Sequence, residues 1–251
     1  MKPSWYARVK AACKLWGYNL VFTFDCADAV DATDLLQTVL IYALPVLFAI
    51  TVHEAAHGYV ARHFGDPTAT ILGRVTLNPL KHIDPIGTIL MPLLLYFSTS
   101  GAFLFGYAKP VPVDFSRLRH PKRDMIWVAL AGPASNFLQA ILWAVLLIVL
   151  VVSGVHERFF LEMARAGILT NLVMWAFNLF PLPPLDGGRV LAGLLPPKLA
   201  YQFSRIEPFG FFIVLGLVIM GVVGTWWLRP LMNWGYEVLD WILTPLTHLL
   251  T

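Results

Sequence analysis

The residues best suited to chemistry are His53, Glu54 and His57, which form the pattern HisGluAlaAlaHis. Four residues advance an α-helix by slightly more than one turn, so the two histidines would lie about 40° apart around the helix axis. Both imidazoles could therefore reach one metal ion, and the pattern is typical of zinc hydrolases. Glu54, on a neighbouring face, could take a proton from the attacking water and later deliver it to the leaving amine.

The surroundings of this pattern strengthen the functional interpretation. HisGluAlaAlaHis lies in the last third of an apolar segment that runs from Leu35 to about Val60 and is long enough to cross a bilayer. Ionisable side chains inside such a segment cost about 3 kcal/mol each, so they usually have a partner or a function. The alternative is a cluster that only packs helices together.

A catalytic zinc ion needs a third protein ligand and one open position. His63 lies ten residues after His53, as in HExxHxxGxxH proteases, but Val60 stands where that motif has its glycine. On a continuing helix His63 would lie about 15 Å along the axis from His53, which excludes it. Asp186 is the better candidate because it lies in ProLeuProProLeuAspGlyGly, where prolines and glycines break regular helix at the end of an apolar segment. Such a break exposes backbone polar groups within the membrane, which is tolerated where these groups line a site. A helix-capping role for Asp186 is the alternative.

The elements that position these residues are predicted to be membrane helices. Of the 251 residues, 58% are hydrophobic and only 13% are charged, which is about half the charged fraction of soluble domains. Further apolar segments cover residues 125–152, 167–185 and 209–228, while 231–250 contains two acids and is expected at the membrane interface. We predict an all-α polytopic membrane protein with about four to six transmembrane helices.

The distribution of basic residues predicts the topology. Loops 62–85, 106–124 and 187–208 carry most of the Lys and Arg residues, so they should be cytoplasmic. Segment 86–105 would then start and end on the same side, which favours a re-entrant hairpin over an ordinary span. By this topology the histidines of the first span and Asp186 come to the same depth, nearer the cytoplasmic side.

Residues 68–77, ThrAlaThrIleLeuGlyArgValThrLeu, favour β-structure and predict a short membrane-associated β-hairpin. Its edge near Arg74–Leu77, or the loop 106–113, could pair with an extended substrate.

We divide the chain into an N-terminal interfacial segment (1–34), a membrane-embedded metalloprotease core (35–228) and a C-terminal interfacial or transmembrane helix (229–251). The net charge of +3 is modest and the basic residues form no single patch, so nucleic acid is excluded as a partner.

Two distant motifs together resemble the site-2 protease family of intramembrane metalloproteases. They are HisGluAlaAlaHis (53–57) and AsnLeuPheProLeuProProLeuAspGlyGly (178–188), and AlaGlyProAlaSerAsn (131–136) also resembles a family signature. The resemblance covers roughly residues 36–190. No stretch could form the PDZ domain that many bacterial members carry, which makes this chain a compact member of bacterial or archaeal type.

The resemblance implies that His53, His57 and Asp186 hold one zinc ion per chain and that Glu54 activates the water. It also implies hydrolysis of peptide bonds in or near transmembrane segments, with a membrane protein or peptide as substrate and the lipid bilayer as surroundings. The expected location is the prokaryotic cell membrane. The oligomeric state is not predicted.

Asn136 and Asn178 are polar residues within apolar segments. Either could bind an unwound substrate backbone or stabilise the tetrahedral oxyanion. The alternative for both is an interhelical hydrogen bond.

Two other functions compete with proteolysis. One is a non-proteolytic membrane metal-binding protein or transporter, and the other is an inactive family member that acts as an adaptor. Glu54 argues against the first, because a binding site needs no unliganded carboxylate beside the metal, and the intact motif argues against the second.

Overall fold

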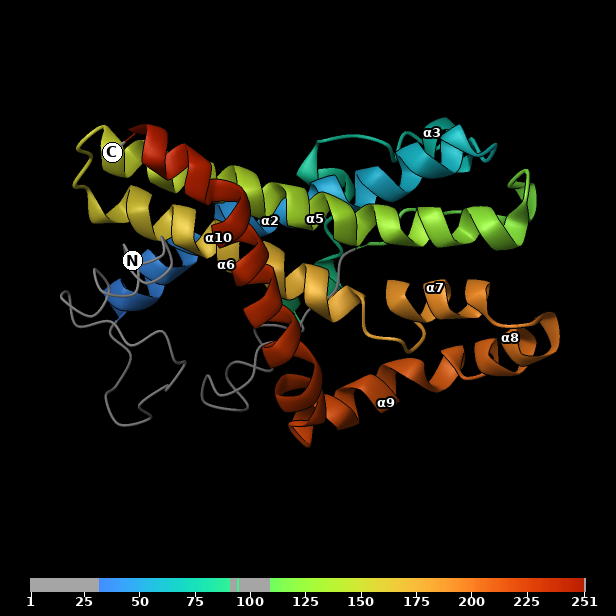
Figure 1. The fold of residues 1–251 in the computed structure, drawn as a ribbon. Coiled ribbons are helices and arrows are strands. Elements are labelled where there is room, and N and C mark those ends of the chain that lie inside the picture. Colours follow the sequence, from blue (N-terminus) through green and yellow to red (C-terminus); the bar gives the residue numbers. More distant parts are fainter. Residues whose placement is uncertain (1–31, 91–93, 95–108, 251) are drawn as a thin grey trace.

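The computed structural model describes residues 32–90, 94 and 109–250, and this part of the chain is built of helices. Three long helices lie side by side: α2 (Ala32–His63), α5 (Pro121–Val152) and α6 (Arg158–Asn178). As Figure 1 shows, α5 runs antiparallel to α2 and α6. The C-terminal ends of α2 and α6 therefore come together beside the first half of α5.

Small residues on α5 and α6 form the centre of the helix packing. Ala140 and Ala144 of α5 and Ala164 of α6 are fully buried, and Leu239 of α10 (Arg229–Leu250) packs against the same cluster. Small side chains let membrane helices approach closely, which is where such helices gain their packing energy. Figure 1 shows α10 crossing α5 and α6 obliquely.

The remaining elements are short. Between α2 and α5 lie α3 (Thr68–Ile71), η1 (Pro79–Lys81), η2 (Pro85–Leu90) and η3 (Phe115–Arg117). After α6 come α7 (Asp186–Leu194), α8 (Pro197–Ser204), α9 (Glu207–Ile219) and η4 (Val223–Leu228).

Two described helices have the length and composition of a membrane span, Leu36–His63 and Pro121–Val152. The pair α8 and α9 adds a third if it counts as one span bent by 67°. Large apolar side chains on α5 are exposed, as a lipid-facing surface requires: Leu138, Leu142, Val149 and Val151. The larger number of spans remains a prediction.

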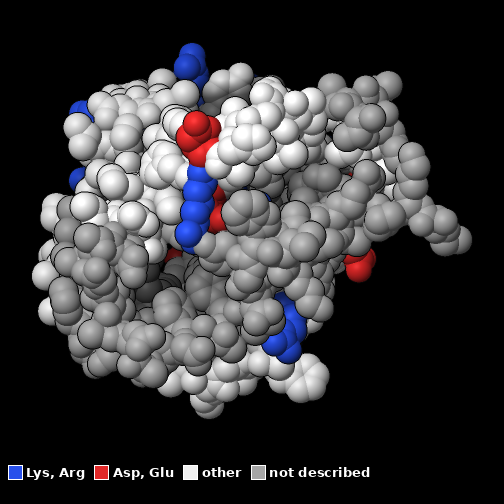
Figure 2. Space-filling view, turned by 90° about the vertical axis from the view of Figure 1, so that its left-hand side faces the viewer, with Lys and Arg blue, Asp and Glu red and all other residues white. Residues whose placement is uncertain are grey.

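Figure 2 views the side of the molecule that holds the α5–α6 turn, where the described residues in view include both basic and acidic side chains. One pair near this turn, Arg165 and Glu162, forms an ion pair of 2.7 Å within α6.

The predicted β-hairpin at 68–77 is wrong, and no strand occurs in residues 32–90 or 109–250. Asp66 explains the difference, because its Oδ1 accepts hydrogen bonds from the backbone N–H and the hydroxyl of Thr68. This local bonding starts the helical turn α3 and competes with an extended strand. The residue types at 68–77 favour β-structure, but they do not show that the carboxylate of Asp66 starts a helical turn here.

Two other segments differ from their predicted boundaries. The helix expected over 167–185 runs over Arg158–Asn178 instead, and the segment 209–228 is divided between α9 and η4. Gly221, with φ +73°, lies at this division, in a conformation that favours glycine. Most of the predicted re-entrant hairpin at 86–105 lies outside the described residues.

Candidate metal centre

Three buried side chains from two parts of the chain converge at one point. His53 and His57 face it from the last third of α2, and Asp186 faces it from the first residue of α7. The two imidazole Nε2 atoms lie 3.0 Å apart, and they lie 3.2 and 3.3 Å from Asp186 Oδ2. Ligand atoms about 2.1 Å from one tetrahedral zinc ion lie roughly 3.4 Å from one another, so the cluster is close to that size.

The backbone around Asp186 explains how a distant carboxylate reaches the histidines. A side chain at Gly187 would place its Cβ 2.1 Å from the carbonyl oxygen of Leu179, so the turn after α6 folds directly onto the start of α7. This close approach needs a residue without a Cβ. The segment with three prolines and two glycines thus brings Asp186 back to α2.

Hydrogen bonding fixes which nitrogen of His57 can hold a metal. Its Nδ1 lies 2.7 Å from the carbonyl oxygen of Val128 on α5. A carbonyl can only accept, so Nδ1 carries the proton and Nε2 turns a lone pair toward Asp186.

The centre has the chemistry that a cation requires. Oδ2 of Asp186 is buried and has no hydrogen-bond partner among the described residues, although it lies against both Nε2 atoms. Acceptor atoms that converge in a buried space repel one another unless a cation lies between them. Within the described parts of the chain these three residues form the group that could hold a metal, and two histidines with one carboxylate suit zinc.

Gly132 of α5 forms one wall of the centre. A Cβ at this position would lie 2.4 Å from Nε2 of His57 and 2.6 Å from Nε2 of His53. The missing side chain therefore leaves the space in which the ligand atoms meet.

A backbone segment that packs against α2 orients Glu54. Its Oε2 accepts a hydrogen bond of 2.7 Å from the backbone N–H of Val111. The same segment is fixed by Arg74, whose guanidinium donates to the carbonyl oxygen of Lys109, and by the N–H of Lys109, which donates to the carbonyl oxygen of His82. Glu54 is half-buried and lies between His53 and His57 in the sequence.

The two predicted asparagines occupy different positions. Asn136 is fully buried, and its Oδ1 lies 2.5 Å from Nδ1 of His53. Asn178 is half-buried and donates to the carbonyl oxygen of Met174 in its own helix. A substrate contact by either stays a prediction, and both N–H groups of Asn136 are already used, by Ala49 and Asn171.

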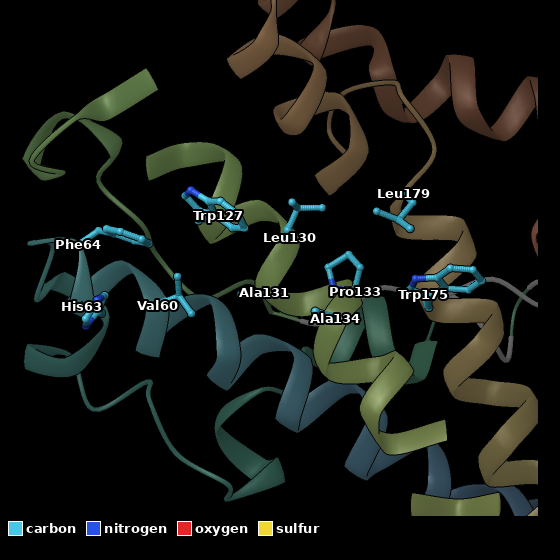
Figure 3. A pocket seen from close by; sticks show the side chains of 10 residues that line it. All are labelled: Val60, His63, Phe64, Trp127, Leu130, Ala131, Pro133, Ala134, Trp175 and Leu179. Atoms are coloured by element: carbon cyan, nitrogen blue, oxygen red, sulfur yellow. The ribbon is translucent and has the colours of Figure 1, made fainter. Parts of the chain in front are cut away.

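An apolar groove of about 540 Å³ lies beside the end of α2. Figure 3 shows its lining from the end of α2, the first half of α5 and the end of α6: Val60, His63, Phe64, Trp127, Leu130, Ala131, Pro133, Ala134, Trp175 and Leu179. His63 belongs to this lining and packs against the ring of Phe64, outside the metal-binding group.

Sequence reasoning did not assign Gly132 or Asn171 to the site. Gly132 stands in AlaGlyProAlaSerAsn, and Asn171 is a polar residue in an apolar helix. A glycine and an amide side chain within apolar segments could have pointed to these two positions. Their contacts, however, depend on how α2, α5 and α6 pack, which the sequence does not show.

Comparison with known proteins agrees with this geometry. The model of peptidase family M50 matches residues 41–169, about half of the chain. "Putative zinc metalloprotease YwhC" of Bacillus subtilis (strain 168) is 38% identical over 203 residues, which cover 77% of this chain and 86% of that protein. "Putative zinc metalloprotease Rip2" of Mycolicibacterium smegmatis is 30% identical over 216 residues, 84% of this chain and 78% of that protein.

A more distant relative is archaeal. Zinc metalloprotease MJ0392 of Methanocaldococcus jannaschii is 28% identical over 156 residues, 62% of this chain and 34% of that protein. No solved structure matches the chain. The matched family region includes HisGluAlaAlaHis and AlaGlyProAlaSerAsn, and the similarity to the bacterial relatives extends over most of both proteins. This chain belongs to peptidase family M50.

Proposed function

We propose that the chain is an intramembrane zinc metalloendopeptidase that hydrolyses peptide bonds in or near transmembrane segments of membrane proteins. The convergence of His53, His57 and Asp186 with the carboxylate of Glu54 beside them carries this proposal. Two helices with the composition of membrane spans, α2 and α5, hold the site between them.

In this proposal His53, His57 and Asp186 bind one zinc ion per chain. Zinc held there would supply Lewis-acid chemistry, polarising the scissile carbonyl and activating a water molecule. Three protein ligands would leave a fourth position of a tetrahedral zinc ion for water or substrate.

Glu54 acts as the general base and then as the general acid. Its carboxylate takes the proton of the attacking water and delivers it to the nitrogen of the leaving amine. The Val111 N–H holds Oε2, so the second oxygen is available for this transfer. Asn178, which is half-buried near the end of α6, is proposed to contact substrate.

We also propose that the chain lies in a prokaryotic cell membrane with the site toward the cytoplasmic side. The basic loops at 62–85, 106–124 and 187–208 support this orientation. The site lies at the end of the bundle that these loops flank, where α2 ends and α5 begins.

The test is cleavage of a helical model substrate by the full chain reconstituted in lipid vesicles. Glu54→Gln should abolish cleavage, because an amide cannot act as the base, while zinc content stays near that of the parent. Cleavage by Glu54→Gln at the rate of the parent would refute the mechanism. A parent protein that binds zinc but cleaves no membrane peptide would refute the function.

A further inference from the structure

A chain of buried amide groups connects α6 to the metal ligand His53. Asn171 Nδ2 lies 2.9 Å from the carbonyl oxygen of Gly167, and Asn136 Nδ2 lies 3.0 Å from Asn171 Oδ1 and 3.1 Å from the carbonyl oxygen of Ala49. Asn136 Oδ1 lies 2.5 Å from His53 Nδ1. Asn136 and Asn171 are both fully buried.

The backbone carbonyls at one end give this chain a single direction. The carbonyl oxygen of Gly167 can only accept, so the NH₂ group of Asn171 faces it and Oδ1 of Asn171 faces Asn136. Oδ1 of Asn171 and the carbonyl oxygen of Ala49 then take both N–H groups of Asn136. The oxygen of Asn136 is left facing His53, so Nδ1 of His53 must carry the proton.

The protonated Nδ1 leaves the lone pair of His53 on Nε2, which is the atom that faces His57 and Asp186. A ligand histidine generally needs such a partner on its other nitrogen, which sets the tautomer and the ring orientation. His57 has the carbonyl of Val128 for this purpose. For His53 the partner is a side chain, and its orientation depends on Asn171.

We propose that Asn136 and Asn171 are positioning residues for the metal centre, which together set the tautomer and orientation of His53. This rests on the proposed function of His53 as a zinc ligand. Polar residues between membrane helices often only join the helices. Here the hydrogen bonds do not end between α5 and α6. They reach Nδ1 of His53 on α2, whose Nε2 faces the metal position.

The test measures zinc affinity of the full chain in detergent by competition with a chelator, together with the absorption spectrum of the Co²⁺-loaded protein. Asn136→Leu removes the acceptor and should weaken zinc binding by roughly ten- to hundredfold. Asn136→Asp keeps an oxygen facing Nδ1–H but loses the two N–H donors to Ala49 and Asn171, so it should recover part of this loss. Asn171→Leu leaves the Asn136 bond in place but frees its amide to turn, so a smaller loss of about threefold to tenfold is expected.

Gln139→Leu is the matched control. Gln139 lies on the same helix one turn beyond Asn136, is 8% exposed, and its Nε2 has no hydrogen-bond partner among the described residues. Removing this amide should leave zinc affinity and the Co²⁺ spectrum unchanged.

The outcomes separate this inference from the proposed function. Equal zinc affinity and equal Co²⁺ spectra for the parent and Asn136→Leu would refute the positioning role of Asn136 and Asn171. Equal losses of zinc affinity in Asn136→Leu and Asn136→Asp would refute it too. If Asn136→Leu fails to fold, zinc affinity and the Co²⁺ spectrum are compared between Asn171→Leu, Asn136→Asp and the control Gln139→Leu. Values for both asparagine variants equal to those of the control would refute the positioning role. A parent protein that binds zinc without cleaving membrane peptides would refute the proposed proteolytic function but not the positioning role of Asn136 and Asn171.

Discussion

The backbone N–H of Val111 donates to Oε2 of Glu54 across 2.7 Å, although 57 residues separate the two in the sequence. Pro110 and Pro112 flank Val111 and have no N–H, so this is the single backbone donor of residues 110–112. A hydrogen bond to a charged carboxylate is among the stronger kinds, and it fixes which oxygen of Glu54 remains free. The segment after residue 108 is therefore part of the site.

We expect Val111→Pro to lower kcat about tenfold, which corresponds to about 1.4 kcal/mol of transition-state stabilisation. The substitution removes the donor, so the carboxylate loses the contact that orients it. KM and zinc content should change little, because neither depends on this bond. Steady-state cleavage of a helical model substrate, with zinc measured by atomic absorption, provides the measurement.

Val111→Ala is the control for this experiment because it shortens the side chain but keeps the N–H. Val111 also packs against the helix at Gly58, where a Cβ would lie 3.1 Å from Val111 Cγ1. Equal kcat values for Val111→Pro and Val111→Ala would show that the hydrogen bond does not position Glu54.

Gly132→Ala should prevent tight zinc binding. The added methyl group would lie 2.4 Å from His57 Nε2 and 2.5 Å from His53 Cε1, so at least one imidazole must move. A ligand displaced by about 1 Å no longer meets the geometry of a tetrahedral ion, and we expect affinity to fall by at least tenfold. Chelator competition measures this change.

Gly216→Ala makes the same substitution in α9, where an added Cβ meets nothing within 4 Å. Zinc affinity of this variant should equal that of the parent. Tight zinc binding by Gly132→Ala would mean that the ligand atoms meet at another place.

The clustering of His53, His57 and Asp186 could be predicted from the sequence because each part has a local signature. His53 and His57 are one helical turn apart, and Asp186 follows a run of prolines that ends an apolar segment. Their meeting in the structure follows from three long helices that alternate in direction, which the apolar segments already indicated. The depth of the site within a membrane stays a prediction.

The contacts around the ligands could not be predicted in the same way. The β-hairpin expected at 68–77 is replaced by α3, because the carboxylate of Asp66 bonds locally to Thr68. The Val111–Glu54 and Asn136–His53 contacts join residues 57 and 83 positions apart, and no local pattern encodes them. Such contacts depend on tertiary packing, which composition and periodicity do not describe.

Asp186→Ala should reduce the zinc content of purified protein to a small fraction of one ion per chain. Removing the carboxylate leaves two neutral imidazoles, which hold zinc far more weakly than two imidazoles and an anion. Metal analysis after dialysis measures the change. Asp114→Ala removes an exposed carboxylate from the segment that holds Val111 and should retain zinc. Unchanged zinc content in Asp186→Ala would remove this residue from the ligand set.

Asp66→Ala tests whether the loop between α2 and α5 stabilises the fold. Asp66 is fully buried, and its carboxylate accepts from the N–H and hydroxyl of Thr68 and, at 2.7 Å, from the N–H of Asp114. Alanine leaves these donors without their partner, at a cost of about 1–3 kcal/mol in the free energy of unfolding. For a chain of this size the midpoint of thermal unfolding should fall by roughly 2–10 °C.

The same substitution should lower cleavage more than stability alone predicts. Asp66 holds the N–H of Asp114, three residues after Val111, so its loss loosens the segment that orients Glu54. We expect kcat to fall at a temperature well below the unfolding midpoint, while zinc content stays unchanged because the ligands are on other elements. Asp114→Ala keeps the backbone N–H, so kcat should stay close to that of the parent. It removes the cap of η3 and the pair with Arg117, which should lower the free energy of unfolding only slightly because both contacts are exposed. A variant Asp66→Ala that unfolds earlier but cleaves at the rate of the parent would show that the loop stabilises the fold without positioning Glu54.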